Sequence, residues 1–377
     1  MTSWTKWCLS EADIILDLCL ASNGPMVSTF EDQVFKLSGS HCDVALVLLH
    51  SPETFLPRGT ADWLTRRNPH IKTHYHVKMA YASDSFDLHS DLARLGRHVL
   101  GLDIGLVLGG GGARGAAHVG LMKVLLEISV PIDRVAGVSI GALIGGLWAI
   151  HRNYDKVEAI AKEWFSDIKY GYIGHLGNLT YPINSPFTGD YFNYTVKKAV
   201  GENIMIEDLW IPFYCCTTDI SQLGQKIHRS GWLWRYVRAS MSYAYLVPPI
   251  CDPRDGHLLI DGCYTENVPG KPMKEARVKY ILVSDIASVD ERNLTNYGDT
   301  LNGWWAAIKS SLWPFGPEIK VPNAEDIQLR IAFCLHYSNL EELKNDPDYE
   351  YISPALGSYT ARDVSSRSGY TLPQIFT

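Results

Sequence analysis

Short apolar runs alternate along the chain with longer amphipathic stretches. Runs that predict strands lie at 43–50, 104–108, 135–138, 213–219, 226–229, 257–260 and 280–285. Helices are predicted at 30–37, 60–67, 87–95, 116–127, 153–168, 190–200, 233–240 and 325–343. For residues 10–18 two structures fit, a helix capped by Ser10 or a strand at 14–18. The order of these segments predicts an α/β protein.

The same pattern divides the chain into three parts. Residues 1–97 predict a small α/β region that packs on a larger domain, which residues 98–352 form. Residues 353–377 are rich in Ser, Tyr and Arg, and we expect a poorly ordered tail.

A glycine-rich turn follows the predicted strand at 104–108. It reads Gly109-Gly110-Gly111-Gly112-Ala113-Arg114-Gly115 and leads into an apolar helix. Glycines at a helix start expose backbone N–H groups that together bind an anion. That anion could be a phosphate or the oxyanion of an ester transition state.

A second turn places a serine between a strand and a helix. Gly137-Val138-Ser139-Ile140-Gly141 fits the G-x-S-x-G pattern of a nucleophile elbow. Its glycines let backbone segments pass close by, and the hydroxyl stands at the carboxyl end of the strands.

Four interpretations of the two turns compete. Gly110-x-Gly112-x-x-Gly115 fits a dinucleotide-binding loop, but the next strand ends in Ser139 rather than in an acidic residue. No Lys-Ser or Lys-Thr follows the glycines, which disfavours a nucleotide P-loop. In the third interpretation both turns are only tight packing turns, with no catalytic or binding role. The pairing of an anion nest with a serine elbow favours an ester hydrolase.

These motifs resemble those of patatin-like phospholipases, and more closely the catalytic region of the neuropathy target esterase family of lysophospholipases. The shared stretches are G-G-G-G-A-R-G, G-x-S-x-G, Asp261-Gly262, 179–182, 206–210, 233–241, 251–253 and 255–259. The resemblance runs from about Trp4 to about Tyr351. It implies a three-layer patatin-like fold with a mainly parallel central sheet, plus the small N-terminal α/β region.

The resemblance also implies a set of site residues. Ser139 is the expected nucleophile and Asp261 its base, without a histidine. The amides of Gly110, Gly111 and Gly112 are the expected oxyanion donors, with Arg114 supporting the loop or a substrate phosphate. The remaining motif glycines are Gly115, Gly137, Gly141 and Gly262. The implied substrate is a phospholipid or lysophospholipid such as lysophosphatidylcholine, with no metal, nucleotide or other cofactor.

One departure from the family pattern adjoins the base. Cys263 stands where the family has Gly or Ala after Asp-Gly, and 242–247 also differs from the usual smaller residues. Overpacking by the thiol would displace Asp261 and impair turnover. A lipid-binding or regulatory module that has lost turnover is therefore the competing hypothesis.

Other residues could supply the base. Asp219 and Asp285 also end strands and are the alternatives to Asp261. A Ser-His-Asp order would need a histidine after the acid, where only His336 follows, and we expect it to lie far away. His257 is expected to point elsewhere, and His118 to be structural.

Composition narrows the partners. The 377 residues are 46% apolar and 20% charged, with a net charge of −7 that gives no support for nucleic-acid binding. The eight cysteines lack C-x-x-C or metal spacing and suit a reducing compartment. No signal peptide is visible, and the apolar window 135–150 is too short to cross a membrane.

The resemblance implies peripheral attachment to the cytoplasmic face of intracellular membranes, in particular the endoplasmic reticulum. The family's N-terminal membrane helix and cyclic-nucleotide-binding-like domains are not in this sequence, so we expect a short isoform or a fragment.

Three further stretches have two interpretations each. His70, His74, His76 and His89 could bind metal, but a solvated loop is favoured because no carboxylates accompany them. Residues 170–190 predict an extended loop, either a lid over the lipid site or a surface connection. Aromatic residues within 296–315, with Trp232 and Trp234, could dock at a membrane or pack internally.

Overall fold

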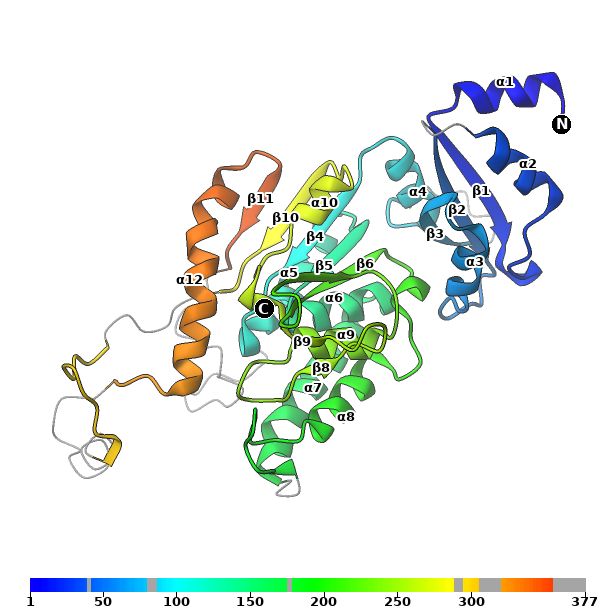
Figure 1. Cartoon of the computed structure of the whole chain (residues 1–377). Coiled ribbons are helices and arrows are strands. Elements are labelled where there is room, and N and C mark those ends of the chain that lie inside the picture. Colours follow the sequence, from blue (N-terminus) through cyan, green and yellow to red (C-terminus); the bar gives the residue numbers. More distant parts are fainter. Residues whose placement is uncertain (39–41, 80–86, 175–177, 288–293, 305–319, 355–377) are drawn as a thin grey trace.

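The computed structural model describes residues 1–38, 42–79, 87–174, 178–287, 294–304 and 320–354. These residues form two β-sheets with helices around them (Figure 1). The expected tail at 353–377 lies almost wholly outside the described residues.

The first sheet belongs to the N-terminal region and is entirely parallel. Its order is β1-β2-β3, with β1 Ile14–Leu20, β2 Asp43–His50 and β3 Ile71–Lys78. The apolar residues of β2 are buried or nearly so, as a central strand with both faces covered requires. The boundary near residue 98 remains a prediction.

The second sheet holds eight strands in the order β11-β10-β4-β5-β6-β9-β8, with β7 also paired to β6. Its strands are β4 Ile104–Leu108, β5 Arg134–Gly137, β6 Phe213–Asp219, β7 Gly224–His228, β8 Ile250–Cys251, β9 Leu258–Asp261, β10 Tyr280–Ser284 and β11 Tyr349–Ile352. The pairs from β11 to β6 are parallel, whereas β7 and β9 run antiparallel to β6, and β8 to β9. The predicted fold class, α/β with a mainly parallel central sheet, is confirmed.

Helices cover both faces of the large sheet. The helices are α1 Ser3–Glu11, α2 Thr29–Leu37, α3 Thr60–Arg67, α4 Asp91–Val99, α5 Ala116–Glu127, α6 Ile140–His151, α7 Tyr154–Gly174, α8 Asp190–Val200, α9 Leu233–Ser240, α10 Lys271–Glu275 and α12 Ala324–Asn345. Leu106 and Val135 face a core shared with α5 to α9, whereas Val107 and Ala136 face a core shared with α10 and α12. This alternation along neighbouring strands produces the three layers.

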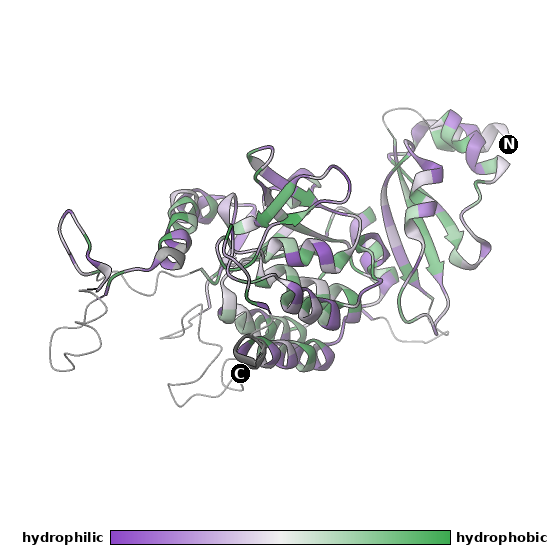
Figure 2. Ribbon diagram, turned by 60° about the horizontal axis from the view of Figure 1, so that its bottom comes forward, coloured by the Kyte–Doolittle hydropathy of each residue, from purple (hydrophilic) through white to green (hydrophobic). Residues whose placement is uncertain are grey.

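Helix α6 lies at the centre of the larger core. Every residue from Ile140 to Ile150 is buried, which is why the sequence is apolar on all sides there. Figure 2 shows the hydrophobic colouring concentrated on the strands of both sheets.

Several predicted elements differ from the structure. Of the two structures that fitted 10–18, the strand is the one that forms, as β1, whereas His74 and His76, expected in a solvated loop, lie on strand β3. Helix α7 continues through Gly174, into the segment 170–190 that was expected to be a loop. Strand β11 was not predicted.

Buried arginines connect the N-terminal region to the large domain. Arg94 of α4 pairs with Asp91 at 2.6 Å and donates to the carbonyls of His76 and Trp210 at 2.8 and 2.9 Å. Arg152, after α6, pairs with the same Asp91. These bonds satisfy carbonyls from both regions at once, so the interface depends on them.

We expect Arg94→Met to lower the free energy of unfolding by about 3 kcal/mol, because it leaves two carbonyls and part of Asp91 without their buried donor. Urea denaturation of the full chain measures it. Lys36→Met is the control, since the Lys36–Asp32 pair is exposed and its loss should cost less than about 1 kcal/mol. Equal effects of the two replacements would contradict this role of Arg94.

Candidate active site

Ser139 occupies a strained turn between β5 and α6. Its φ of 54° and ψ of −124° are values that L-residues rarely adopt. A Cβ on Gly137 would lie 2.3 Å from the carbonyl carbon of Gly141, and one on Gly141 would lie 2.2 Å from the oxygen of Leu108. Both positions therefore require glycine, and their close contacts hold the elbow against β4.

The hydroxyl of Ser139 meets the carboxyl of Asp261. Ser139 Oγ donates to Asp261 Oδ2 at 2.8 Å across 122 positions of sequence. Asp261 is the last residue of β9, and β6 lies between β9 and β5 in the sheet. The sheet order thus brings a strand-end serine and a strand-end aspartate together.

Burial changes the pKa of the Asp261 carboxyl. Desolvation raises the pKa of Asp261 to about 6, against the opposing effect of hydrogen bonds from the Cys263 amide, the Ser139 hydroxyl and the Cys263 thiol. A carboxylate with such a pKa is a stronger base than one in water, yet is mostly ionised at neutral pH. Next to Cys263, Asp261 is still within hydrogen-bond distance of Ser139, at 2.8 Å.

A second serine fixes the elbow. The backbone N–H of Ser139 donates to Ser240 Oγ at 2.9 Å, and that hydroxyl donates to the carbonyl of Cys216 at 2.7 Å. Sequence reasoning missed Ser240, although it lies within the 233–241 stretch that carries the resemblance.

The glycine-rich turn lies directly beside Ser139. A Cβ on Gly110 would sit 3.1 Å from Ser139 Cβ and 2.7 Å from Asn267 Oδ1. The Gly110 amide donates to Asn267 Oδ1 and its carbonyl accepts from Asn267 Nδ2, both at 3.2 Å. Within the described part of the chain, the amides of Gly111 and Gly112 bond to no acceptor. Asn267, another residue that the sequence did not reveal, thus clamps one end of the turn.

A buried histidine supports the same turn. His118 Nε2 lies 2.8 Å from the carbonyl of Gly109, and Nδ1 lies 3.0 Å from Ser284 Oγ. Burial lowers the pKa of His118 to about 4, so the ring stays neutral and structural, as expected. Arg114 is also buried, in the short 3₁₀ turn Gly112–Gly115.

The alternative acids are engaged elsewhere. Asp219 Oδ2 lies 2.8 Å from His257 Nδ1, and Asp285 Oδ2 lies 2.8 Å from His336 Nε2. Burial would raise the pKa of each carboxyl, but hydrogen bonds, including those to the histidines, outweigh burial and hold both pKa values below the usual range. Of the three strand-end acids, Asp261 is the one hydrogen-bonded to Ser139.

Two of the four histidines considered as metal ligands bond to the protein backbone instead. His74 and His76 lie on β3, and each Nε2 is within 3.0 Å of the carbonyl of Glu207. His76 Nδ1 is also 2.9 Å from His50 Nε2. Burial lowers the pKa of His74 and of His76, so these rings bond as neutral groups.

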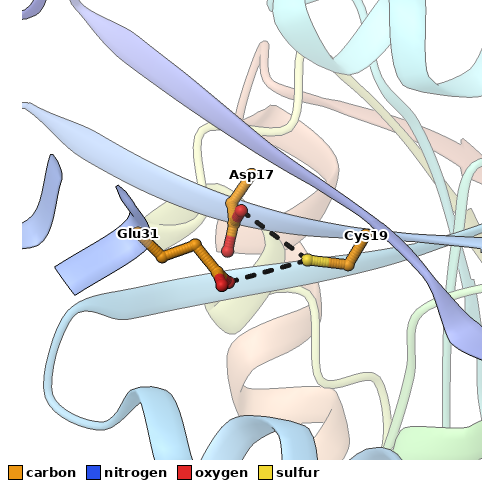
Figure 3. Close-up of side chains that lie close together, drawn as sticks. All are labelled: Asp17, Cys19 and Glu31. Atoms are coloured by element: carbon orange, nitrogen blue, oxygen red, sulfur yellow. Dashed lines mark hydrogen bonds between the residues drawn. The ribbon is translucent and has the colours of Figure 1, made fainter. Parts of the chain in front are cut away.

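Among the described residues, one group has metal-ligand spacing, namely Asp17, Cys19 and Glu31 (Figure 3). The buried Arg67 already lies among them, 3.3 Å from Asp17 and 2.5 Å from Glu31. The guanidinium bonds to both carboxylates, so this cluster is explained as a buried structural ion-pair network without a metal.

Comparisons with known proteins assign two parts of the chain to families. Residues 106–273 match the family Patatin-like phospholipase, and residues 1–101 match the Neuropathy Target Esterase family P-loop like domain. The chain therefore carries a patatin-like phospholipase domain, the class of hydrolases that act on lipid esters, together with this P-loop like domain.

Two much longer proteins align with most of this chain. It is 41% identical over 378 residues to Neuropathy target esterase sws of Drosophila melanogaster, and 40% identical over 419 residues to that of Drosophila mojavensis. Each alignment covers 95% of this chain but 26% and 28% of those proteins. The crystal structure of VipD from Legionella pneumophila is a distant likeness, at 15% identity and a TM-score of 0.39 over 72% of this chain and 64% of that one.

The strain at Ser139 predicts a difference between two replacements. Ser139→Gly should be about 1 kcal/mol more stable than Ser139→Ala, because glycine relieves the unfavourable dihedrals and this gain exceeds its extra backbone entropy. Both variants lose the bond to Asp261, so the comparison isolates the backbone. Denaturant titration measures it, and an alanine variant as stable as the glycine variant would show that the elbow is unstrained.

Proposed function

We propose that this chain hydrolyses carboxylic ester bonds of phospholipids or lysophospholipids, such as lysophosphatidylcholine, with Ser139 as nucleophile and Asp261 as base. The observation that carries the proposal is the 2.8 Å hydrogen bond between the two side chains at a strained elbow. The patatin-like phospholipase match supports the ester class, and the names of the relatives support an esterase.

The geometry supports a two-step reaction. Ser139 Oγ attacks the acyl carbonyl while Asp261 takes its proton, and that proton passes to the leaving alcohol as the acyl-enzyme forms. Water then attacks the acyl-enzyme while Asp261 takes its proton, and Asp261 passes that proton to Ser139 Oγ as the fatty acid leaves.

The glycine-rich turn would hold the negative charge that develops on the carbonyl oxygen. The amides of Gly111 and Gly112 are the donors we assign to it. The amide of Gly110 donates to Asn267 Oδ1, so it can donate to the oxyanion only if that bond breaks. We therefore assign two donors, whereas the resemblance implied three. Arg114 is assigned to the support of this turn.

Lipid substrates require access to a membrane surface. Among the described helices, none is long and apolar enough to cross a bilayer. Trp304 is 81% exposed and Trp232 37% exposed, whereas Trp305, Trp313 and Phe315 lie outside the described residues. We assign the chain a peripheral attachment, through exposed aromatics such as Trp304, to the cytoplasmic face of the endoplasmic reticulum.

A lipid-binding module without turnover is the second candidate, and Cys263 against the base is the observation that favours it. The intact contact between Ser139 and Asp261 favours the enzyme.

Ser139→Ala should reduce fatty-acid release from lysophosphatidylcholine by at least about a thousandfold, because the nucleophile is lost. Ser10→Ala, on the exposed helix α1, is the matched control and should retain full activity. Release of fatty acid by neither the wild type nor the control would refute the enzyme and leave the lipid-binding module.

The pKa of Asp261 predicts the pH profile. The base acts when ionised, so kcat/KM should fall about tenfold per pH unit below about 6 and level off above it. The Cys263 thiol lowers this pKa, so Cys263→Ala should move the midpoint to higher pH. A profile that stays flat down to pH 4 would exclude Asp261 as the base.

A further inference from the structure

A large cavity lies far from Ser139, between the N-terminal region and the large sheet. Its volume is about 540 Å³, within the range of small-molecule sites. Helix α3 and strand β3 form one wall, and the first residues of β5 and β6 with helix α10 form the other. No residue of the proposed ester-hydrolysis site lines it.

The cavity and the proposed ester-hydrolysis site lie at opposite ends of strand β5. The cavity is lined by Arg134, the first residue of β5, and by Phe213, the first residue of β6. Ser139 follows the last residue of β5, Gly137. The full length of strand β5, which rises about 3.3 Å per residue, therefore lies between the cavity and the elbow at Ser139.

The charges around the cavity have one sign. Lys72, Arg134 and Arg229 line it, and no aspartate or glutamate does, although the chain as a whole carries a net charge of −7. Lys72 pairs with Asp43, and Arg134 lies 2.9 Å from Asp103. Those two charges are therefore already balanced by carboxylates outside the cavity.

Arg229 differs from the other two cations. Within the described part of the chain it forms no ion pair, and its guanidinium carbon lies 5.3 Å from the centroid of the Tyr214 ring. An exposed guanidinium fixed over an aromatic ring, at the edge of a cavity without acids, suits a carboxylate or phosphate.

Most of the remaining lining is apolar. Aliphatic and aromatic side chains contribute from both walls, among them Leu64, Ile71, Ile206, Leu209, Phe213 and Met273. A small polar anion would leave these apolar side chains in contact with water, whereas an alkyl chain would remove them from water.

We propose that this cavity binds an amphiphilic anion. Its charged headgroup contacts Arg229, and its apolar chain packs against the apolar side chains of the two cavity walls. Two sources share this chemistry, a long-chain carboxylate and an alkyl phosphate. The cavity is a ligand site separate from Ser139, and it stands whether or not the proposed hydrolysis is correct.

Calorimetric titration of the full chain tests the proposal, with decanoate and decyl phosphate as probes below their micelle concentrations. At least one should bind, and Arg229→Gln should weaken that binding by about tenfold or more. The tighter of the two probes identifies the source. Arg58→Gln, which removes an exposed arginine outside the cavity, is the matched control and should bind like the wild type.

Two more variants separate the sites. Thr73→Trp places an indole in the cavity and should also abolish binding, with thermal unfolding showing that the variant is folded. Asp261→Asn should leave binding unchanged, because it alters only the proposed hydrolytic site. Binding that Asp261→Asn removes and Arg229→Gln does not would overturn the proposal.

Decanol and adenosine monophosphate serve as comparison ligands. Decanol lacks the charge and should bind at least tenfold more weakly than the better anion. Equal binding of decanol would overturn the role of Arg229. Tighter binding of adenosine monophosphate that Arg229→Gln removes would reassign the cavity to nucleotides.

Discussion

The close approach of the β5–α6 turn to strand β4 is the constraint on which the rest of the site depends. Gly141 touches the carbonyl of Leu108 so closely that any side chain there would collide with backbone. This contact fixes where α6 begins and forces Ser139 into its unusual dihedrals. The hydroxyl therefore projects toward Asp261 because of backbone packing, before any hydrogen bond is formed.

Buried polar side chains then hold the backbone around this point. Ser240, Asn267 and His118 come from three different elements, and each bonds a main-chain group of the elbow or of the glycine-rich turn. Within the described part of the chain none of the three hydrogen-bonds the carboxyl of Asp261, so they act through the backbone that they position. Such support is what preorganised donors require, because an oxyanion gains little from amides that must reorient.

The sequence alone predicted the elbow, the glycine-rich turn and the pairing of Ser139 with Asp261, because each depends on glycine spacing or on a resemblance carried by short motifs. It could not reveal Asn267 or Ser240, since a lone polar residue gives no periodic signal. Strand β3 was missed because its sequence contains His74 and His76, and their burial depends on the carbonyl of Glu207, distant in the chain. The regular apolar segments were predicted well, because their burial follows from local pattern.

The position of β6 between the two strands that carry Ser139 and Asp261 has a consequence for motion. Ser139 and Asp261 are attached to strands on opposite sides of one completely buried strand, so moving them apart requires β5 or β9 to shift against β6. Local opening of outer loops would therefore leave their contact intact. Their amide hydrogens should be among the slowest in the protein to exchange with solvent, and loss of the contact on heating should coincide with global unfolding rather than precede it.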